Sequence, residues 1–151
     1  MSLRTPLRLV LTVALTVLPS VARAAVAVDM SVASEFQCAL DTTGTVFCWG
    51  RNGFGQLGTG DNTDRGAPTA LSGLGSGVLS VAAGWLHACA VTAAGGVKCW
   101  GSNYNGSLGD GTTTDANAPQ DVPGLTSGVA AVAAAGTYAC VLTTAGSVSC
   151  W

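Results

Sequence analysis

Polar and apolar side chains alternate in short runs along this chain, and the runs come in pairs separated by a tight turn. Alternation with a period of two indicates β-strands that bury one face. In the first pair the turn is Thr42-Thr43-Gly44, and the corresponding turns end in Gly95 and Gly146. A three-residue hairpin loop favours glycine at its third place, because that residue adopts a positive φ. The pattern therefore predicts a chain of antiparallel hairpins.

The length of this loop fixes which residues face each other across the first hairpin. Counting outward from the turn places Leu40 opposite Val46 and Cys38 opposite Cys48. If the pair that closes the loop is hydrogen-bonded, the cysteines fall at a non-hydrogen-bonded pair, whose Cα separation of ~4.5 Å a disulfide can just span. Six cysteines allow many connectivities, but the recurrence of the hairpin favours the local one. We therefore expect three disulfides, within the pairs Cys38 and Cys48, Cys89 and Cys99, and Cys140 and Cys150.

Both faces of the first hairpin are largely apolar. Leu40 and Val46 share one face with the cysteines. The other face carries Ala39, Phe47 and Trp49. Apolar residues on both sides are typical of a sheet that lies between two neighbours. We therefore expect each hairpin to belong to a sheet wedged between two others.

The cysteine pairs recur every 51 residues, and each pair is followed by a tryptophan, at Trp49, Trp100 and Trp151. A period near this length is typical of stacked repeats and of propeller blades. The copies run over 28–78, 79–129 and 130–151, and the third stops at its tryptophan where the others continue. We therefore expect an N-terminal fragment of a longer repeat protein.

The longest repeated pattern is Trp-Gly-x-Asn-x-x-Gly-x-Leu-Gly-x-Gly, which occurs at 49–60 and again at 100–111. A short segment with Pro68 or Pro119 follows, and Val-Ala-Ala-Gly-x-x-His-x-Cys-Ala-Val stands at 81–91. Together these residues resemble the regulator of chromosome condensation repeat. The resemblance implies four-stranded antiparallel blades around an axis, usually seven to a ring. The expected fold is thus all-β, a partial β-propeller of about two and a third repeats in an open arc.

The first 24 residues have the three parts of a secretory signal. Arg4 and Arg8 precede an apolar run over 9–18, and Ala22-Arg23-Ala24 provides the small residues of a cleavage site. The apolar run is well short of the ~20 residues that a helix needs to cross a membrane. We expect a signal peptide at 1–24 and an incomplete propeller at 25–151 that is secreted, periplasmic or at the cell surface. Export also provides the oxidising environment that disulfides need.

Without its first 24 residues the chain carries three cations, Arg51, Arg65 and Lys98, against eight acidic residues, which gives a net charge of −5. Phosphate backbones and anionic membrane surfaces attract clustered lysine and arginine. Neither the number nor the spacing of the cations here provides such a cluster. Nucleic acid and membrane are therefore excluded as expected partners.

Two loop patterns resemble ligand motifs but lack the surroundings that those motifs need. Residues 53–58 spell Gly-x-Gly-x-x-Gly, yet no helix follows, as a dinucleotide-binding fold requires. The acidic loops 61–64 and 110–115 lack the spacing and the terminal glutamate of a Ca²⁺ loop. No cofactor is therefore predicted.

A metal site and a catalytic site are also not predicted. The sequence contains no Cys-x-x-Cys pair, and His87 is the only histidine. His87 stands where the other copies have Phe36 and Tyr138, so we expect this position to be occupied for packing. The nucleophile elbow Gly-x-Ser-x-Gly does not occur either.

Phe54 and Tyr104 occupy the long loops that follow the tryptophans, and Arg51 lies close to the first of them. Aromatic residues and arginine are enriched where proteins bind each other, although such rings also pack against adjacent blades. The resemblance points the same way, because secreted bacterial relatives, including a β-lactamase-inhibitory propeller, bind proteins through aromatic rim loops. Arg51, Phe54 and Tyr104 are therefore the predicted protein-binding residues.

The expected function is that of a secreted scaffold that binds an extracellular or periplasmic protein through these loops and does not itself catalyse a reaction. Two alternatives remain open at this point. One is an extracellular enzyme whose catalytic residues lie in further blades. The other is a passive structural module of a larger surface protein.

Overall fold

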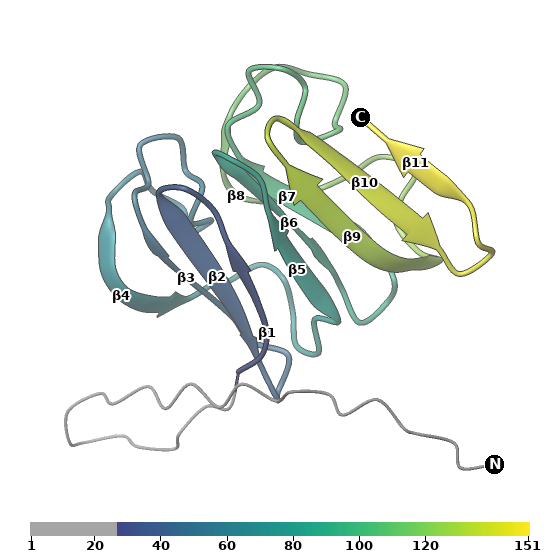
Figure 1. Ribbon diagram of the computed structural model, residues 1–151, viewed down its shortest axis with the longest axis horizontal. Helices are drawn as coiled ribbons and strands as arrows, with labels where there is room; N and C mark the ends of the chain where they lie inside the picture. The colour runs from purple at the N-terminus through teal and green to yellow at the C-terminus, as the bar shows by residue number, and fades with distance from the viewer. Residues whose placement is uncertain (1–26) are drawn as a thin grey trace, which may run out of the picture.

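The computed structural model describes residues 27–151, and this part of the chain contains β-strands and connecting loops without a helix (Figure 1). The predicted signal peptide, residues 1–24, lies outside the described residues. Within 27–151 the structure accordingly has no helix that is long and apolar enough to span a membrane.

The strands of this region form three antiparallel sheets, which we call blades, and strands adjacent in sequence are adjacent in each sheet. Blade 1 contains β1 (Ala27–Val32), β2 (Phe36–Asp41), β3 (Val46–Gly50) and β4 (Arg65–Ala70). Blade 2 contains β5 (Ser80–Ala83), β6 (His87–Val91), β7 (Val97–Gly101) and β8 (Ala116–Asp121). Blade 3 contains β9 (Val129–Ala135), β10 (Tyr138–Thr143) and β11 (Val148–Cys150).

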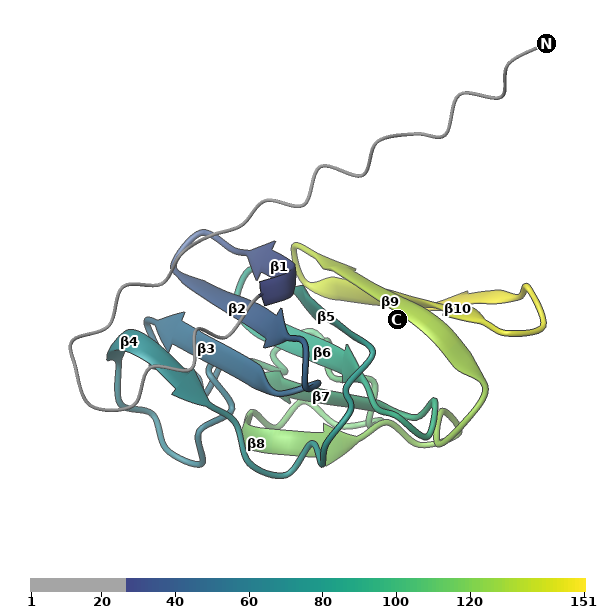
Figure 2. The ribbon, with the colours of Figure 1, turned by 90° about the horizontal axis from the view of Figure 1, so that it is seen from below.

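The first strands of successive blades lie next to one another, since β1 contacts β5 and β5 contacts β9. Figure 2 shows these three strands close together, with β4 and β8 on the opposite side of the molecule. Pro68 and Pro119 lie in β4 and β8, edge strands where a missing N–H is tolerated. The arrangement is an open arc of radial blades, which confirms the predicted all-β partial propeller.

The hairpin register is the one predicted from the length of the turn. Leu40 lies opposite Val46 and Cys38 opposite Cys48. The turn glycine, Gly44, has φ of +78°. In blade 3, Ala139 and Trp151 exchange two backbone hydrogen bonds of 3.0 Å, so the neighbouring cysteine pair is the non-hydrogen-bonded kind.

All three expected disulfides are present within their hairpins. The Cα atoms of Cys38 and Cys48 are 4.2 Å apart, and the corresponding separation is 4.1 Å in the other two pairs. No cysteine is left free. The bridges join β2 to β3 and β6 to β7, the central strands of blades 1 and 2, and in blade 3 the bridge joins β10 to the edge strand β11. Each bridge thus ties together two strands that the turn already pairs.

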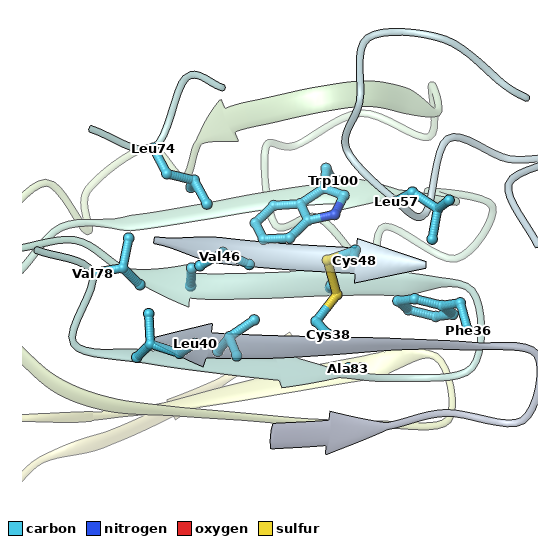
Figure 3. Packing of buried hydrophobic residues seen from close by; sticks show 13 residues of the cluster. Phe36, Cys38, Leu40, Val46, Cys48, Leu57, Leu74, Val78, Ala83 and Trp100 are labelled. Atoms are coloured by element: carbon cyan, nitrogen blue, oxygen red, sulfur yellow. A yellow bond between two sulfur atoms is a disulfide. The ribbon is translucent and has the colours of Figure 1, made fainter. Parts of the chain in front are cut away.

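Blades 1 and 2 each pack the disulfide face, the side from which the cysteines project, against the opposite face of the next blade. Leu40, Val46 and the Cys38–Cys48 bridge form one buried cluster with Ala88, Ala90 and Trp100 of blade 2. Figure 3 shows Trp100 beside this bridge. Blade 2 repeats the contact, because Cys89, Val91 and Val97 are buried with Ala139 and Val141 of blade 3, and the partly buried Trp151 packs against them.

The expectation that both faces of every blade are covered is correct only for blade 2. All five residues of β6 are buried. On the disulfide face of blade 3, by contrast, Tyr138 is 55% exposed, Leu142 42% and Val148 66%. The corresponding residues of blade 1 are at most 3% exposed, because blade 2 covers them whereas no described residue covers blade 3 on that side.

The repeated tryptophan joins each blade to the long loop of the blade before it. Trp100 Nε1 donates to the carbonyl of Gln56 at 3.0 Å, and Trp151 Nε1 donates to the carbonyl of Ser107 at the same distance. The close approach requires glycine two residues after the acceptor. A Cβ on Gly58 would lie 2.8 Å from two atoms of the Trp100 ring, and Gly58 also has φ of +69°.

Replacing Trp100 with phenylalanine tests this junction. The variant keeps an aromatic ring but leaves the buried carbonyl of Gln56 without its donor, which costs about 1–3 kcal/mol in the free energy of unfolding. Urea denaturation followed by circular dichroism measures the loss. Trp49→Phe is the matched control, because the Trp49 indole donates no hydrogen bond to any residue in 27–151. Equal losses in the two variants would show that the hydrogen bond contributes nothing.

Removing one disulfide at a time, by replacing both of its cysteines with alanine, separates the contribution of chain entropy to stability from that of packing. Each bridge closes a loop with a sequence separation of 10, so each double alanine variant loses about 2–3 kcal/mol through the unfolded chain. Cys89 and Cys99 are fully buried against blade 3, and their replacement creates a cavity that costs about 1–2 kcal/mol more. Urea denaturation should therefore rank the Cys89/Cys99 variant below the Cys140/Cys150 variant in stability. The reverse order would contradict the packing argument.

Candidate binding site in the rim loops

Two long loops, 51–64 between β3 and β4 and 102–115 between β7 and β8, are each shaped by a buried asparagine. Asn52 Oδ1 accepts from the backbone N of Leu57 at 2.9 Å, while its Nδ2 donates to the carbonyl oxygens of Asp61 and Thr63 at 2.9 and 3.1 Å. Asn103 makes the equivalent bond to Leu108 at 2.9 Å. Because both asparagines are fully buried, the loops have a fixed shape despite their many glycines.

Three aromatic side chains from different loops line one open pocket of about 620 Å³ at this rim. Phe54 belongs to the β3–β4 loop, Trp85 to the turn 84–86 between β5 and β6, and Tyr104 to the β7–β8 loop. Their exposed fractions are 45%, 63% and 82%. The backbone N of Trp85 donates to the carbonyl of Gly136 at 2.8 Å, which holds its turn against blade 3.

These aromatic residues stand at positions where the copies differ. One period away from Trp85 lie Ser34 and Gly136. The position of Phe54 carries asparagine in the next copy, and the position of Tyr104 carries glycine in the previous one. Since the other copies form the same blade without these rings, the fold does not require them.

The lining of the pocket includes His87, a residue that is only 1% exposed. Its Nε2 is buried without a hydrogen-bond partner among the described residues. Burial lowers the pKa of His87 from its usual 6.5 to about 4, against the opposing effect of a backbone hydrogen bond to Tyr138. The ring is therefore neutral at neutral pH. The expectation that this position serves packing agrees with its burial.

The carboxylates of the long loops bind their own backbone. Asp61 Oδ1 accepts from the N of Thr63 at 2.9 Å, and Asp110 Oδ1 accepts from the N of Thr112 at 2.8 Å. The hydrogen bond from Thr63 is the main reason that the pKa of Asp61 is below its usual value. For Asp110, burial raises the pKa, but the hydrogen bonds to the carboxylate, those from Thr112 and Asn103 among them, together outweigh it and the net shift is downward. In the part that the structure describes, no three His, Cys, Asp or Glu side chains are grouped as a metal site would need.

The structure brings two of the three predicted binding residues together and leaves the third apart. Phe54 and Tyr104 line the same pocket, whereas Arg51 lies outside its lining and pairs with Glu35 at 2.8 Å. Sequence reasoning missed Trp85. The available signal was that Trp85 is the one tryptophan outside the 51-residue frame of the other three.

Comparison with known proteins gives one family. The family model described as the regulator of chromosome condensation (RCC1) repeat matches residues 43–91 and 94–142, and a second model of the same repeat matches 78–107. The human E3 ubiquitin-protein ligase HERC2 is 37% identical over 99 residues, which cover 65% of this chain and 2% of the ligase.

Solved structures show the same blades. Human WBSCR16 superposes with a TM-score of 0.77 at 30% identity, over 84% of this chain and 33% of that protein. Prp20p from Saccharomyces cerevisiae superposes with a TM-score of 0.66 at 20% identity, over 78% of this chain and 31% of that one. The chain thus spans about a third of these structures and a small fraction of the ligase.

His87 predicts a pH dependence of stability. Its folded-state pKa of about 4 lies below the unfolded value of 6.5, so the unfolded chain binds a proton more readily. The contribution of neutral His87 to the free energy of unfolding is fully present above pH ~6.5. It falls as the pH is lowered toward 4, by up to about 3 kcal/mol. Urea denaturation at pH 7 and at pH 4.5 measures the change.

His87→Phe is the matched variant, because blade 1 has Phe36 at this position. It should lose less stability between pH 7 and pH 4.5 than the unchanged chain, while the carboxylates contribute equally to both. Identical losses in the two proteins would show that His87 does not titrate in this range.

Proposed function

This chain belongs to the regulator of chromosome condensation (RCC1) repeat family, and we propose that it is an exported scaffold that binds a partner protein through its rim loops, without catalysing a reaction itself. The observation that carries the proposal is the pocket lined by Phe54, Trp85 and Tyr104. Large aromatic side chains around a hollow are the usual anchors of protein interfaces.

The three rings are held on a rigid base, which favours binding. The loop of Phe54 is fixed by Asn52 and by the Trp100 indole that donates to Gln56. The loop of Tyr104 is fixed by Asn103 and by the Trp151 indole of blade 3, and Ser107 Oγ of this loop also donates to the carbonyl of Thr137 in blade 3 at 2.6 Å. A rigid site loses little conformational entropy when a partner binds.

Arg51 is assigned a peripheral role in this proposal. Its guanidinium and the Glu35 carboxylate are both exposed, at 67% and 39% of their side-chain surface. An ion pair in this setting contributes little to stability, so Arg51 is free to exchange Glu35 for a carboxylate of the partner. We place it at the edge of the interface.

Two observations support export after removal of residues 1–24. All six cysteines of the chain are in disulfides, which persist in oxidising compartments and are rare in the cytosol. The predicted signal peptide points to the same route. As a precedent for protein binding on this fold, the Prp20p structure was described together with its binding to Gsp1p and histones, and that property is said of Prp20p alone.

Photo-crosslinking tests the proposal. With p-benzoylphenylalanine in place of Tyr104 in the full chain, irradiation in the compartment where the chain resides should attach a partner protein. Trp85→Ser and Phe54→Asn, which introduce the residues of other copies, should each reduce the yield by roughly tenfold, because each removes an aromatic anchor.

The control places the same crosslinker at Leu79, which is 56% exposed and does not line the pocket. Proteins that become crosslinked to the Leu79 probe should be crosslinked equally well when Trp85→Ser is introduced. If the Tyr104 probe attaches no protein, or attaches one equally well in Trp85→Ser, the rim is not a binding site.

A further inference from the structure

In residues 27–151 every cation is in an ion pair, but most of the carboxylates are not. Each of the three cations has a carboxylate partner: Arg51 pairs with Glu35 at 2.8 Å, Arg65 with Asp61 at 2.7 Å and Lys98 with Asp121 at 2.8 Å. The described region has five further carboxylates, and none of them is in an ion pair with a cation of this region, namely Asp29, Asp41, Asp64, Asp110 and Asp115.

Two of these carboxylates stand beside the aromatic pocket. Asp115 lines the pocket itself together with Phe54. Asp115 and Phe54 also line a second hollow next to it, of about 510 Å³, and Asp110 belongs to that hollow as well. The two hollows therefore share a boundary made of the Phe54 ring, Thr114 and the Asp115 carboxylate.

The available oxygen at this boundary belongs to Asp115. Its Oδ1 accepts from the backbone N of Asn103 at 2.7 Å, and the side chain as a whole is exposed. No hydrogen bond from a described residue reaches Oδ2. One oxygen of Asp115 thus holds the loop, while the other accepts no hydrogen bond from a described residue.

No positive charge of this region lies in the lining of the pocket. Arg51, Arg65 and Lys98 are absent from it, and His87, which is present, is neutral above pH ~4. Faces of aromatic rings attract cations through their quadrupole, and a nearby carboxylate adds to that attraction. An acidic partner would meet repulsion here, and a wholly apolar one would cover a carboxylate without compensating it.

We propose that the partner bound at the rim presents a lysine or arginine side chain to this pocket, with the cation against the rings of Trp85 and Tyr104 and near Asp115. The inference rests on the proposed function and specifies the chemistry of the partner. The aliphatic stem of such a side chain packs on the rings, while its charged end remains beside the carboxylate.

Titration of the full chain with small probes tests the proposal. The probes are the N-acetyl N-methylamides of lysine and arginine, with the norleucine compound as an uncharged analogue of lysine. Nuclear magnetic resonance follows the indole N–H of Trp85 and the ring of Tyr104. A cationic probe should bind roughly three- to tenfold more tightly than norleucine, and added salt should weaken it alone.

Asp115→Asn locates the site, because asparagine still offers an oxygen to Asn103 while losing the charge. Asp115→Asn should weaken the binding of the cationic probes several-fold and leave the binding of the norleucine compound unchanged. Asp29→Asn is the matched control, since it removes an unpaired carboxylate of β1, away from the pocket. Asp29→Asn should change neither the affinity for the cationic probes nor that for the norleucine compound.

Equal binding of the cationic and neutral probes would overturn the cationic assignment, and so would a failure of all three to shift Trp85. An equal effect of Asp29→Asn and Asp115→Asn would show long-range attraction by net charge and would also overturn it. None of these outcomes decides whether a protein binds at the rim. That question is answered by the crosslink from Tyr104, so the two proposals fail separately.

Discussion

The packing of one blade on the next depends on a single hydrogen bond that recurs along the chain, from the indole N–H of a tryptophan to a carbonyl in the long loop of the preceding blade. Hydrophobic contact alone holds two sheets together without fixing how they slide past each other. The indole bond has a direction and one acceptor. It therefore fixes the position of Trp100 against Gln56, and each of these tryptophans is also in contact with the buried apolar cluster between its blade and the preceding one.

The same bond is what positions the rim site. Gln56 lies two residues after Phe54, so the indole of blade 2 holds the backbone that carries this ring. The equivalent bond from Trp151 holds the backbone that carries Tyr104. Rings that are 50 residues apart in sequence thus face one hollow. One repeated interaction thus fixes both the contact between blades and the backbone of the candidate binding site.

The hairpins, the disulfides and the blade architecture could be predicted because they depend on local spacing. A loop that ends in Gly44 sets the register of the residues on either side, and Cys38 meets Cys48 as a consequence. The site depends instead on which loops of different blades become neighbours. No local spacing places Trp85 beside Phe54, and none shows that Arg51 turns to Glu35 instead. The exposure of the disulfide face of blade 3 could not be predicted for the same reason, since whether a face is covered depends on which blade lies next to it.

In a repeat protein, departure from the repeat and exposure are separate signals, and only their combination selects the site. His87 departs from Phe36 and Tyr138, but it is buried in the lining of the pocket. Leu79 is exposed, but the previous copy has Val28 there, which is also exposed, so the position is simply tolerant of apolar residues. Phe54, Trp85 and Tyr104 combine a large exposed ring with a polar or small residue at each matching place, whereas the exposed Tyr138 is matched by the rings of Phe36 and His87. An exposed ring buries little apolar surface within its own blade, and this is why these three residues form the candidate binding site.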